Sequence, residues 1–207
     1  MITIYGMQDS GNCYKPRLLL ALLGRPFRHV EVSMLDGGTK RPEFVALNPK
    51  GQVPLLELED GRTLSESDAI LCFLGEGTAF VPVDPFERAR MLQWMFFEQN
   101  GHEMFVAGRR SLLVYPERRA LATPERLADQ LRRGEAALAV MEGQLAKTPF
   151  LLGDAPSLAD LALYAYTHCA EQGGFSLTPT IARWIAAIAA LPGYRPMTWL
   201  PESASSQ

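Results

Sequence analysis

The most informative stretch of this chain is Asn-Pro-Lys-Gly-Gln-Val-Pro at residues 48–54, followed by Ser-Glu-Ser-Asp-Ala-Ile at residues 65–70. The first segment ends in a Val-Pro pair and leads into an apolar stretch at 55–58, which predicts a strand. Asp60-Gly61 predicts a turn, and a second short strand at 62–64 precedes a helix. A loop that ends in proline therefore lies beside a strand edge and near a helix N-terminus. Such an arrangement suits an extended peptide that carries a carboxylate.

Upstream of this stretch the sequence predicts a β-α-β unit. Residues 2–5 read as a strand, residues 14–23 as a helix ended by Gly24, and residues 29–32 as a second strand. The crossover should be right-handed and the two strands parallel. Together with the hairpin and a helix at 66–74, these elements resemble the thioredoxin-like fold, whose order β-α-β-α-β-β-α has one more helix before the hairpin.

The remainder of the chain carries no strand pattern. We expect a thioredoxin-like domain at 1–77, a linker rich in proline at 78–86 and an all-helical domain at 87–207. Ser157 and Asp160 have the spacing of a capping box at the start of a helix. The predicted helices of this domain are Arg88 to Phe105, Pro124 to Leu145, Leu158 to Glu171 and Thr180 to Ala190.

Composition excludes several classes of protein. Apolar residues make up 47% of the chain and charged residues 21%, and the net charge of −3 gives no reason to expect nucleic acid or an anionic membrane as partner. Cys13, Cys72 and Cys169 are scattered without metal-ligand spacing, which indicates a reduced protein without a metal site. No secretion signal or membrane-spanning stretch is apparent, so we expect a cytoplasmic protein.

The quoted motifs resemble the glutathione-binding half of the cytosolic glutathione S-transferases, in particular bacterial members with a serine in the first loop. The resemblance covers nearly the whole chain. It implies an α/β plus all-α fold and a homodimer. It also implies an enzyme with glutathione as co-substrate, which stabilises the glutathione thiolate and adds it to a small hydrophobic electrophile in detoxification.

The resemblance assigns the γ-glutamyl end of glutathione to Glu66 and Ser67. The serine hydroxyl and the first helical amides would bind the α-carboxylate, and the carboxylate of Glu66 would face the ammonium. The residues alone leave an alternative open, because Ser65 and Asp68 have the spacing of another capping box.

The resemblance assigns the binding of the cysteinyl residue and the glycine end of glutathione to the residues before the hairpin. By resemblance, Val53 lends its backbone groups to the cysteinyl residue, and Pro54 follows a cis peptide bond. Lys40 and Lys50 are candidates for the glycine carboxylate, although exposed lysines without a ligand fit the sequence as well.

The thiol should meet the loop after the first strand. Ser10 matches the serine that activates the thiol in related enzymes, and the side-chain amide of Asn12 could share this role. Both residue types are also common turn and cap residues. Cys13 and Tyr5 are rivals, since some relatives use a cysteine or a tyrosine here. Pro16 fits the first helical turn if the helix begins at residue 12 or 13.

Gln99, Met104, Phe105 and Arg109 are weaker candidates, for the electrophile pocket or the dimer side. Three alternative functions remain open: a glutathione-dependent thiol-disulfide reductase that uses Cys13, an isomerase of the maleylacetoacetate type, and a non-catalytic binding protein with the same fold.

Overall fold

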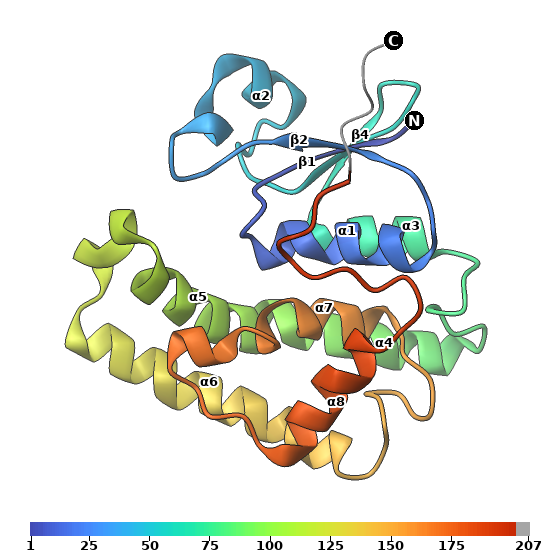
Figure 1. Ribbon diagram of the computed structural model, residues 1–207, viewed down its shortest axis with the longest axis vertical. Coiled ribbons are helices and arrows are strands. Elements are labelled where there is room, and N and C mark those ends of the chain that lie inside the picture. Colours follow the sequence, from blue (N-terminus) through green and yellow to red (C-terminus); the bar gives the residue numbers. More distant parts are fainter. Residues whose placement is uncertain (202–207) are drawn as a thin grey trace. The chain divides into compact units, whose positions relative to one another are not determined.

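The computed structural model describes residues 1–201 and divides the chain into two compact units. The first unit comprises Met1–Glu76 together with the described residues from Leu191 onward, and the second comprises Gly77–Ala190. The boundary near residue 77 lies at the start of the linker expected at 78–86. The sequence placed all of 87–207 in one helical domain, whereas in the structure the chain from Leu191 returns to the first unit and runs past its first helix (Figure 1).

A four-stranded mixed sheet forms the middle of the first unit. Its strands have the order β2-β1-β3-β4, with β1 parallel to β2 and antiparallel to β3, which pairs antiparallel with β4. The strands are β1 (Thr3–Gly6), β2 (Arg28–Glu31), β3 (Leu55–Glu57) and β4 (Thr63–Ser65). The predicted β-α-β unit and hairpin are thereby confirmed.

Helices cover this sheet on both sides. The helices α1 (Gly11–Leu22) and α3 (Ser67–Gly75) lie side by side below it in Figure 1, and α2 (Pro42–Leu47) lies on the opposite side after a short 3-10 turn, Gly38–Lys40. The element order is that of the predicted thioredoxin-like domain. Leu18, Leu19 and Leu20 of α1 are fully buried.

Helix α1 begins earlier than the sequence predicted. Ser10 is its N-cap, so the first helical residue is Gly11 rather than residue 12, 13 or 14. Pro16 is then the sixth residue of the helix and lies inside it. Proline has no N–H to donate, so the usual helical hydrogen bond from residue 16 to the carbonyl of residue 12 is not formed. The condition under which Pro16 would fit the first turn, a helix that begins at residue 12 or 13, is therefore not met.

The second unit is helical throughout. The predicted helix at 124–145 is confirmed with the same ends, whereas a π-helical segment, Glu98–His102, separates two helices where one was predicted at 88–105. The helices are α4 (Pro85–Phe97), α5 (Glu103–Val114), α6 (Pro124–Leu145), α7 (Leu158–Thr167) and α8 (Pro179–Ala189). Short 3-10 segments lie at Pro116–Leu121 and Ala170–Gly173.

The capping box at the start of α7 is confirmed. The buried carboxylate of Asp160 accepts hydrogen bonds from the backbone N–H of Ser157 (2.8 Å), the N–H of Leu151 (3.0 Å) and Nε1 of Trp184 (2.9 Å). Burial raises the pKa of Asp160 despite these donors. Every residue of α7 is buried, so the box fixes the start of the helix at the core of this unit.

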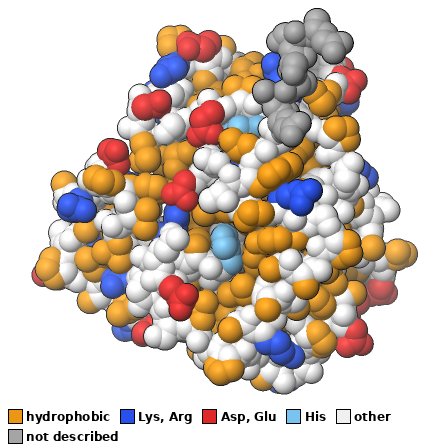
Figure 2. All heavy atoms as spheres, viewed as in Figure 1, with side chains coloured by type: hydrophobic (Ala, Val, Ile, Leu, Met, Phe, Trp, Pro, Cys, Tyr) orange, Lys and Arg blue, Asp and Glu red, His pale blue; other side chains and the backbone are white. Residues whose placement is uncertain are grey.

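The face drawn in Figure 2 has no dominant charge. Figure 2 shows acidic and basic side chains interspersed with hydrophobic ones over the face that it draws. Within residues 1–201, none of the helices combines the length and the apolar character that crossing a bilayer requires.

Candidate functional site

Glu66 has a backbone conformation that few residues other than glycine adopt. Its φ is 71° and its ψ is 115°. Glu66 lies just before α3, and Ser67 is the first residue of that helix. A residue held in this region costs about 1–3 kcal/mol and is often found at ligand sites. The first N–H groups of a helix have no partner within the helix and carry partial positive charge. Ser67 therefore begins a helix whose N-terminus suits an anion.

The register of the hairpin brings the two motifs together. Leu55 of β3 pairs with Ser65 of β4, so Pro54 and Glu66 both leave the hairpin at the same end. The peptide bond between Val53 and Pro54 is cis, as the resemblance implied. Val53 lies just outside the strand ladder, two residues before the start of β3.

The loop before Val53 is held by Asn48. The side-chain amide of Asn48 donates to the carbonyl of Gln52 (2.7 Å), and its side-chain oxygen accepts from the N–H of Lys50 (3.2 Å). The ammonium of Lys40 donates to the carbonyls of Gly51 (3.0 Å) and Lys50 (3.4 Å). Lys40 thus holds the backbone of the loop in this structure.

The ammonium of Lys50 forms an ion pair with the carboxylate of Glu66. Both side chains are more than half exposed, so water weakens their attraction. Lys50 and Glu66 are the groups predicted to bind opposite ends of glutathione. In this structure their charges compensate each other at the surface.

Asn12 and Ser67 are joined directly. The hydroxyl of Ser67 donates to Oδ1 of Asn12 (3.2 Å) and accepts from the ammonium of Lys15 (3.2 Å). Lys15 also forms an ion pair with Asp68 (3.0 Å). The start of α1 and the start of α3 thus share one polar cluster, which we call the Lys15 cluster: Asn12, Lys15, Ser67 and Asp68.

Sequence reasoning missed Lys15 and, as a site residue, Asp68. The available signal was a lysine within a helix whose neighbours are apolar, combined with an acid in the first turn of α3. Lys15 is fully buried, which a lysine tolerates only with a partner.

Ser10 caps α1 from a buried position. Its hydroxyl oxygen accepts from the N–H of Cys13 at 3.4 Å, and its side chain also bonds the Cys13 thiol. Only 5% of Ser10 is exposed. The cap function that the sequence left open is therefore present, on the loop where the thiol of a ligand is expected.

Cys13 is packed into the interior. The residue is fully buried, and a Cβ on Gly6 of β1 would lie 2.9 Å from the Cβ of Cys13. Burial raises the pKa of the Cys13 thiol to about 11, although the hydrogen bond from Ser10 opposes this shift. A reactive cysteine needs an exposed thiolate, so both properties argue against Cys13 as a nucleophile.

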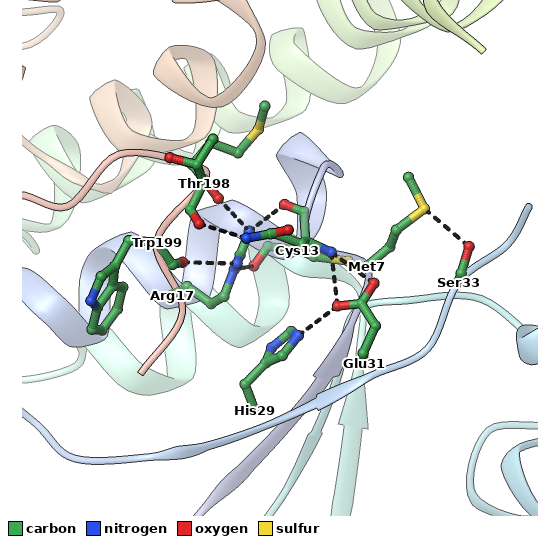
Figure 3. A network of polar contacts seen from close by, with 10 residues as sticks. Met7, Cys13, Arg17, His29, Glu31, Ser33, Thr198 and Trp199 are labelled. Carbon is green, nitrogen blue, oxygen red and sulfur yellow. Dashed lines mark hydrogen bonds and ion pairs between the residues drawn. The ribbon is translucent and has the colours of Figure 1, made fainter. Parts of the chain in front are cut away.

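Arg17 holds the loop between β1 and α1 from below. Its Nε donates to the carbonyl of Cys13 (3.2 Å), and one terminal nitrogen donates to those of Gln8 (2.6 Å) and Met197 (3.2 Å). The other terminal nitrogen donates to the carbonyl of Trp199 (3.1 Å). Figure 3 shows Arg17 between the C-terminal segment and this loop.

Glu31 of β2 holds the other side of the loop. Its carboxylate accepts from the N–H of Gln8 (3.1 Å) and contacts Nε2 of His29 (2.9 Å), as Figure 3 shows for the histidine. Burial lowers the pKa of His29, which favours the neutral ring. The loop that ends at Ser10 is therefore fixed by side chains from two other elements.

Tyr5 is engaged elsewhere. Its hydroxyl donates to a carboxylate oxygen of Glu57 at 2.7 Å, and burial followed by this contact raises the pKa of Tyr5. A cavity of about 380 Å³ beside Tyr5 and Phe44 contains none of the residues predicted to bind glutathione. These contacts favour a structural role for Tyr5.

The four candidates of the second unit differ in exposure. Met104 is 59% exposed, whereas Phe105 is buried. The amide of Gln99 donates to the neighbouring Glu103 (2.8 Å), and Nε of Arg109 donates to the carbonyl of Gly173 (2.6 Å). Gln99 and Arg109 thus hold partners within their own unit.

The chemistry of the first unit is that of an anion and peptide site. It combines a helix N-terminus, a serine hydroxyl, two lysines and an extended loop, and the described residues contain no group of three or more potential metal ligands. Such a site can hold a small peptide by its carboxylates and its backbone.

Comparison with known proteins gives consistent results. Residues 9–76 match the family model of the glutathione S-transferase N-terminal domain, and residues 124–200 match that of the C-terminal domain. Maleylacetoacetate isomerase of Pseudomonas aeruginosa is 31% identical, with 93% of each chain covered. The crystal structure of a glutathione S-transferase from Pseudomonas fluorescens has a TM-score of 0.89 at 46% identity, covering 95% of this chain and 98% of that one. A possible glutathione S-transferase from Rhodopseudomonas palustris has a TM-score of 0.93 at 45% identity, covering 97% and 99%.

Proposed function

Because the chain belongs to the glutathione S-transferase family, we propose that its first unit binds glutathione, stabilises the thiolate and adds it to a small hydrophobic electrophile. One observation carries this proposal: the hairpin register makes Pro54 and Glu66, a residue with positive φ that precedes Ser67, leave the hairpin at the same end. A peptide backbone and a carboxylate can be bound together there.

The γ-glutamyl end would bind at the start of α3. The hydroxyl of Ser67 and the first amides of α3 would donate to the α-carboxylate, while Glu66 would accept from the ammonium. In this scheme the ligand ammonium replaces Lys50 at Glu66. Lys50, together with Lys40, would then face the glycine carboxylate.

The thiol would reach the start of α1. A free thiol has a pKa near ~8.5, so it is mostly protonated at neutral pH. Ser10 and Asn12 would donate hydrogen bonds to the thiolate, and the N-terminus of α1 would add partial positive charge. Thiolate stabilisation and positioning would supply most of the rate enhancement.

The electrophile pocket and the assembly are further parts of this proposal. We assign the pocket or the dimer side to Gln99, Met104, Phe105 and Arg109. We further infer a homodimer in the cytoplasm, where the three free cysteines stay reduced.

Calorimetric titration with glutathione tests the proposal. We expect the wild type to bind glutathione and Ser67→Ala to bind it at least tenfold more weakly. Thiolate absorbance should show a depressed pKa for the thiol of the bound glutathione. That pKa should rise in Ser10→Ala or Asn12→Ala. Ser111→Ala, whose hydroxyl bonds the Gly108 carbonyl within α5, is the matched control and should bind normally. No binding by the wild type would overturn the proposed function.

A glutathione-dependent isomerase is the second candidate, because the isomerase of Pseudomonas aeruginosa is 31% identical over nearly the whole chain. The same thiolate would add to a conjugated double bond and leave again after rotation. Conversion of maleylacetoacetate without consumption of glutathione would identify this activity, whereas conjugation of a chloronitrobenzene alone would favour the transferase.

A further inference from the structure

We propose that Lys15 is a positioning residue for the carboxylate that binds at the start of α3, and that it acts through the hydroxyl of Ser67. This inference rests on the proposed function, since it concerns the same ligand. It adds a residue to the site that lies beneath the first turn of α3.

The buried ammonium of Lys15 contacts two side chains of α3. It lies 3.0 Å from a carboxylate oxygen of Asp68, whose side chain is 16% exposed, and 3.2 Å from Oγ of Ser67. An isolated charge in the interior is costly, so the ion pair with Asp68 explains how Lys15 is retained there. That pair alone does not require the second contact with Ser67.

The contact with Ser67 fixes the direction of a hydrogen-bond chain. An ammonium has only donors, so Oγ of Ser67 must accept from Lys15. The single hydroxyl proton of Ser67 must then point to another acceptor, which in this structure is Oδ1 of Asn12 at 3.2 Å. The order of donation is therefore Lys15 to Ser67 to Asn12.

A ligand carboxylate would take the place of one member of this chain. A carboxylate only accepts hydrogen bonds, and it would receive the proton that Ser67 now gives to Asn12. Lys15 keeps the hydroxyl oriented for that exchange and strengthens it as a donor, because its charge lies in a poorly hydrated interior. The exchange also removes the hydrogen bond from Ser67 to Oδ1 of Asn12, which lies in the first turn of α1.

A double-mutant cycle tests this role. Asp68→Asn serves as the parent, so that removal of the lysine does not leave the carboxylate of Asp68 without this cation. Lys15→Met is then introduced with Ser67 present and with Ser67→Ala, and the Kd of glutathione is measured by calorimetry. We expect Lys15→Met to raise the Kd of glutathione about tenfold when Ser67 is present and less than about twofold when Ser67 is replaced by alanine. The gap between these two effects is the size expected for one charge-assisted hydrogen bond.

Equal losses in both backgrounds would overturn the proposal, because a merely structural lysine acts independently of Ser67. If the Lys15→Met double variant does not fold, Lys15→Gln in the same parent replaces it, with the same dependence on Ser67 expected. Binding with equal losses overturns only the role of Lys15. Absence of binding by the wild type overturns the proposed function and this inference with it.

Discussion

Helix α1 carries two buried cations only two residues apart, and their surroundings differ. Lys15 contacts side chains at the start of α3, namely Ser67 and Asp68. Arg17 donates to four backbone carbonyls, of which two belong to the C-terminal segment. Residues two apart on a helix point to nearly opposite sides, so the two cations serve different neighbours.

The difference separates a structural cation from one at a candidate ligand site. Carbonyl acceptors cannot leave without unfolding their segments, so the contacts of Arg17 are permanent parts of the fold. The hydroxyl of Ser67 can rotate and exchange its partner, so the contact with Lys15 can respond to a ligand. The following predictions test this contrast, beginning with the largest effect.

Arg17→Met should lower the free energy of unfolding by roughly 4 kcal/mol, because it removes a charged donor from four backbone carbonyls. Urea unfolding followed by circular dichroism measures this loss. Arg17→Lys is the matched control, and it should recover only part of the stability because an ammonium cannot span the same carbonyls. A loss below about 1 kcal/mol in Arg17→Met would contradict the structural role.

Lys15→Met alone should cost about 3 kcal/mol of unfolding free energy, because it leaves the mostly buried carboxylate of Asp68 without its cation. The double variant with Asp68→Asn should recover most of that loss, and the same urea titration measures both. A double variant as unstable as the single one would show that Lys15 contributes through packing rather than charge.

Cys13 should make stability depend on alkaline pH. Its pKa is raised from an ordinary value of 9.0 to about 11, so the folded state keeps the thiol proton longer than the unfolded state. This contribution is fully present below pH 9 and is lost as the pH rises through 11, which amounts to roughly 3 kcal/mol. Unfolding of wild type and Cys13→Ala, compared at pH 8.5 and 10.5, measures it. Parallel pH dependences would contradict the burial of the thiol.

Much of the fold could be predicted because it follows local patterns. The β-α-β unit, the hairpin and the helix at 124–145 are encoded by apolar periodicity and by turn residues. The return of the chain from Leu191 to the first unit could not be predicted, because it depends on backbone carbonyls meeting Arg17 about 180 residues away. The π-helical segment at 98–102 likewise has no local signal in the sequence.

Sequence reasoning identified more of the candidate site near the start of α3 than near the start of α1. Glu66 and Ser67 follow from a motif contiguous in sequence, and the hairpin register places them beside Pro54. Lys15 was missed because its value depends on contacts with α3, more than 50 residues later. The burial of Ser10 was not predicted for a related reason, because a single sequence does not show how closely β1 packs against α1.

Ser10→Ala gives the smallest of the expected stability effects. It separates a structural role of Ser10 from a role in ligand binding. Ser10 caps α1 by accepting from the N–H of Cys13, so its loss should cost about 1 kcal/mol of unfolding free energy. Thr123→Ala is the matched control, since Thr123 caps α6 in the same way through the N–H of Arg126. Both variants should lose similar stability in urea, but only Ser10→Ala should raise the pKa of bound glutathione. Equal thiol pKa values in the two variants would leave Ser10 a cap and move the donor role to Asn12, whose side chain already joins the Lys15 cluster.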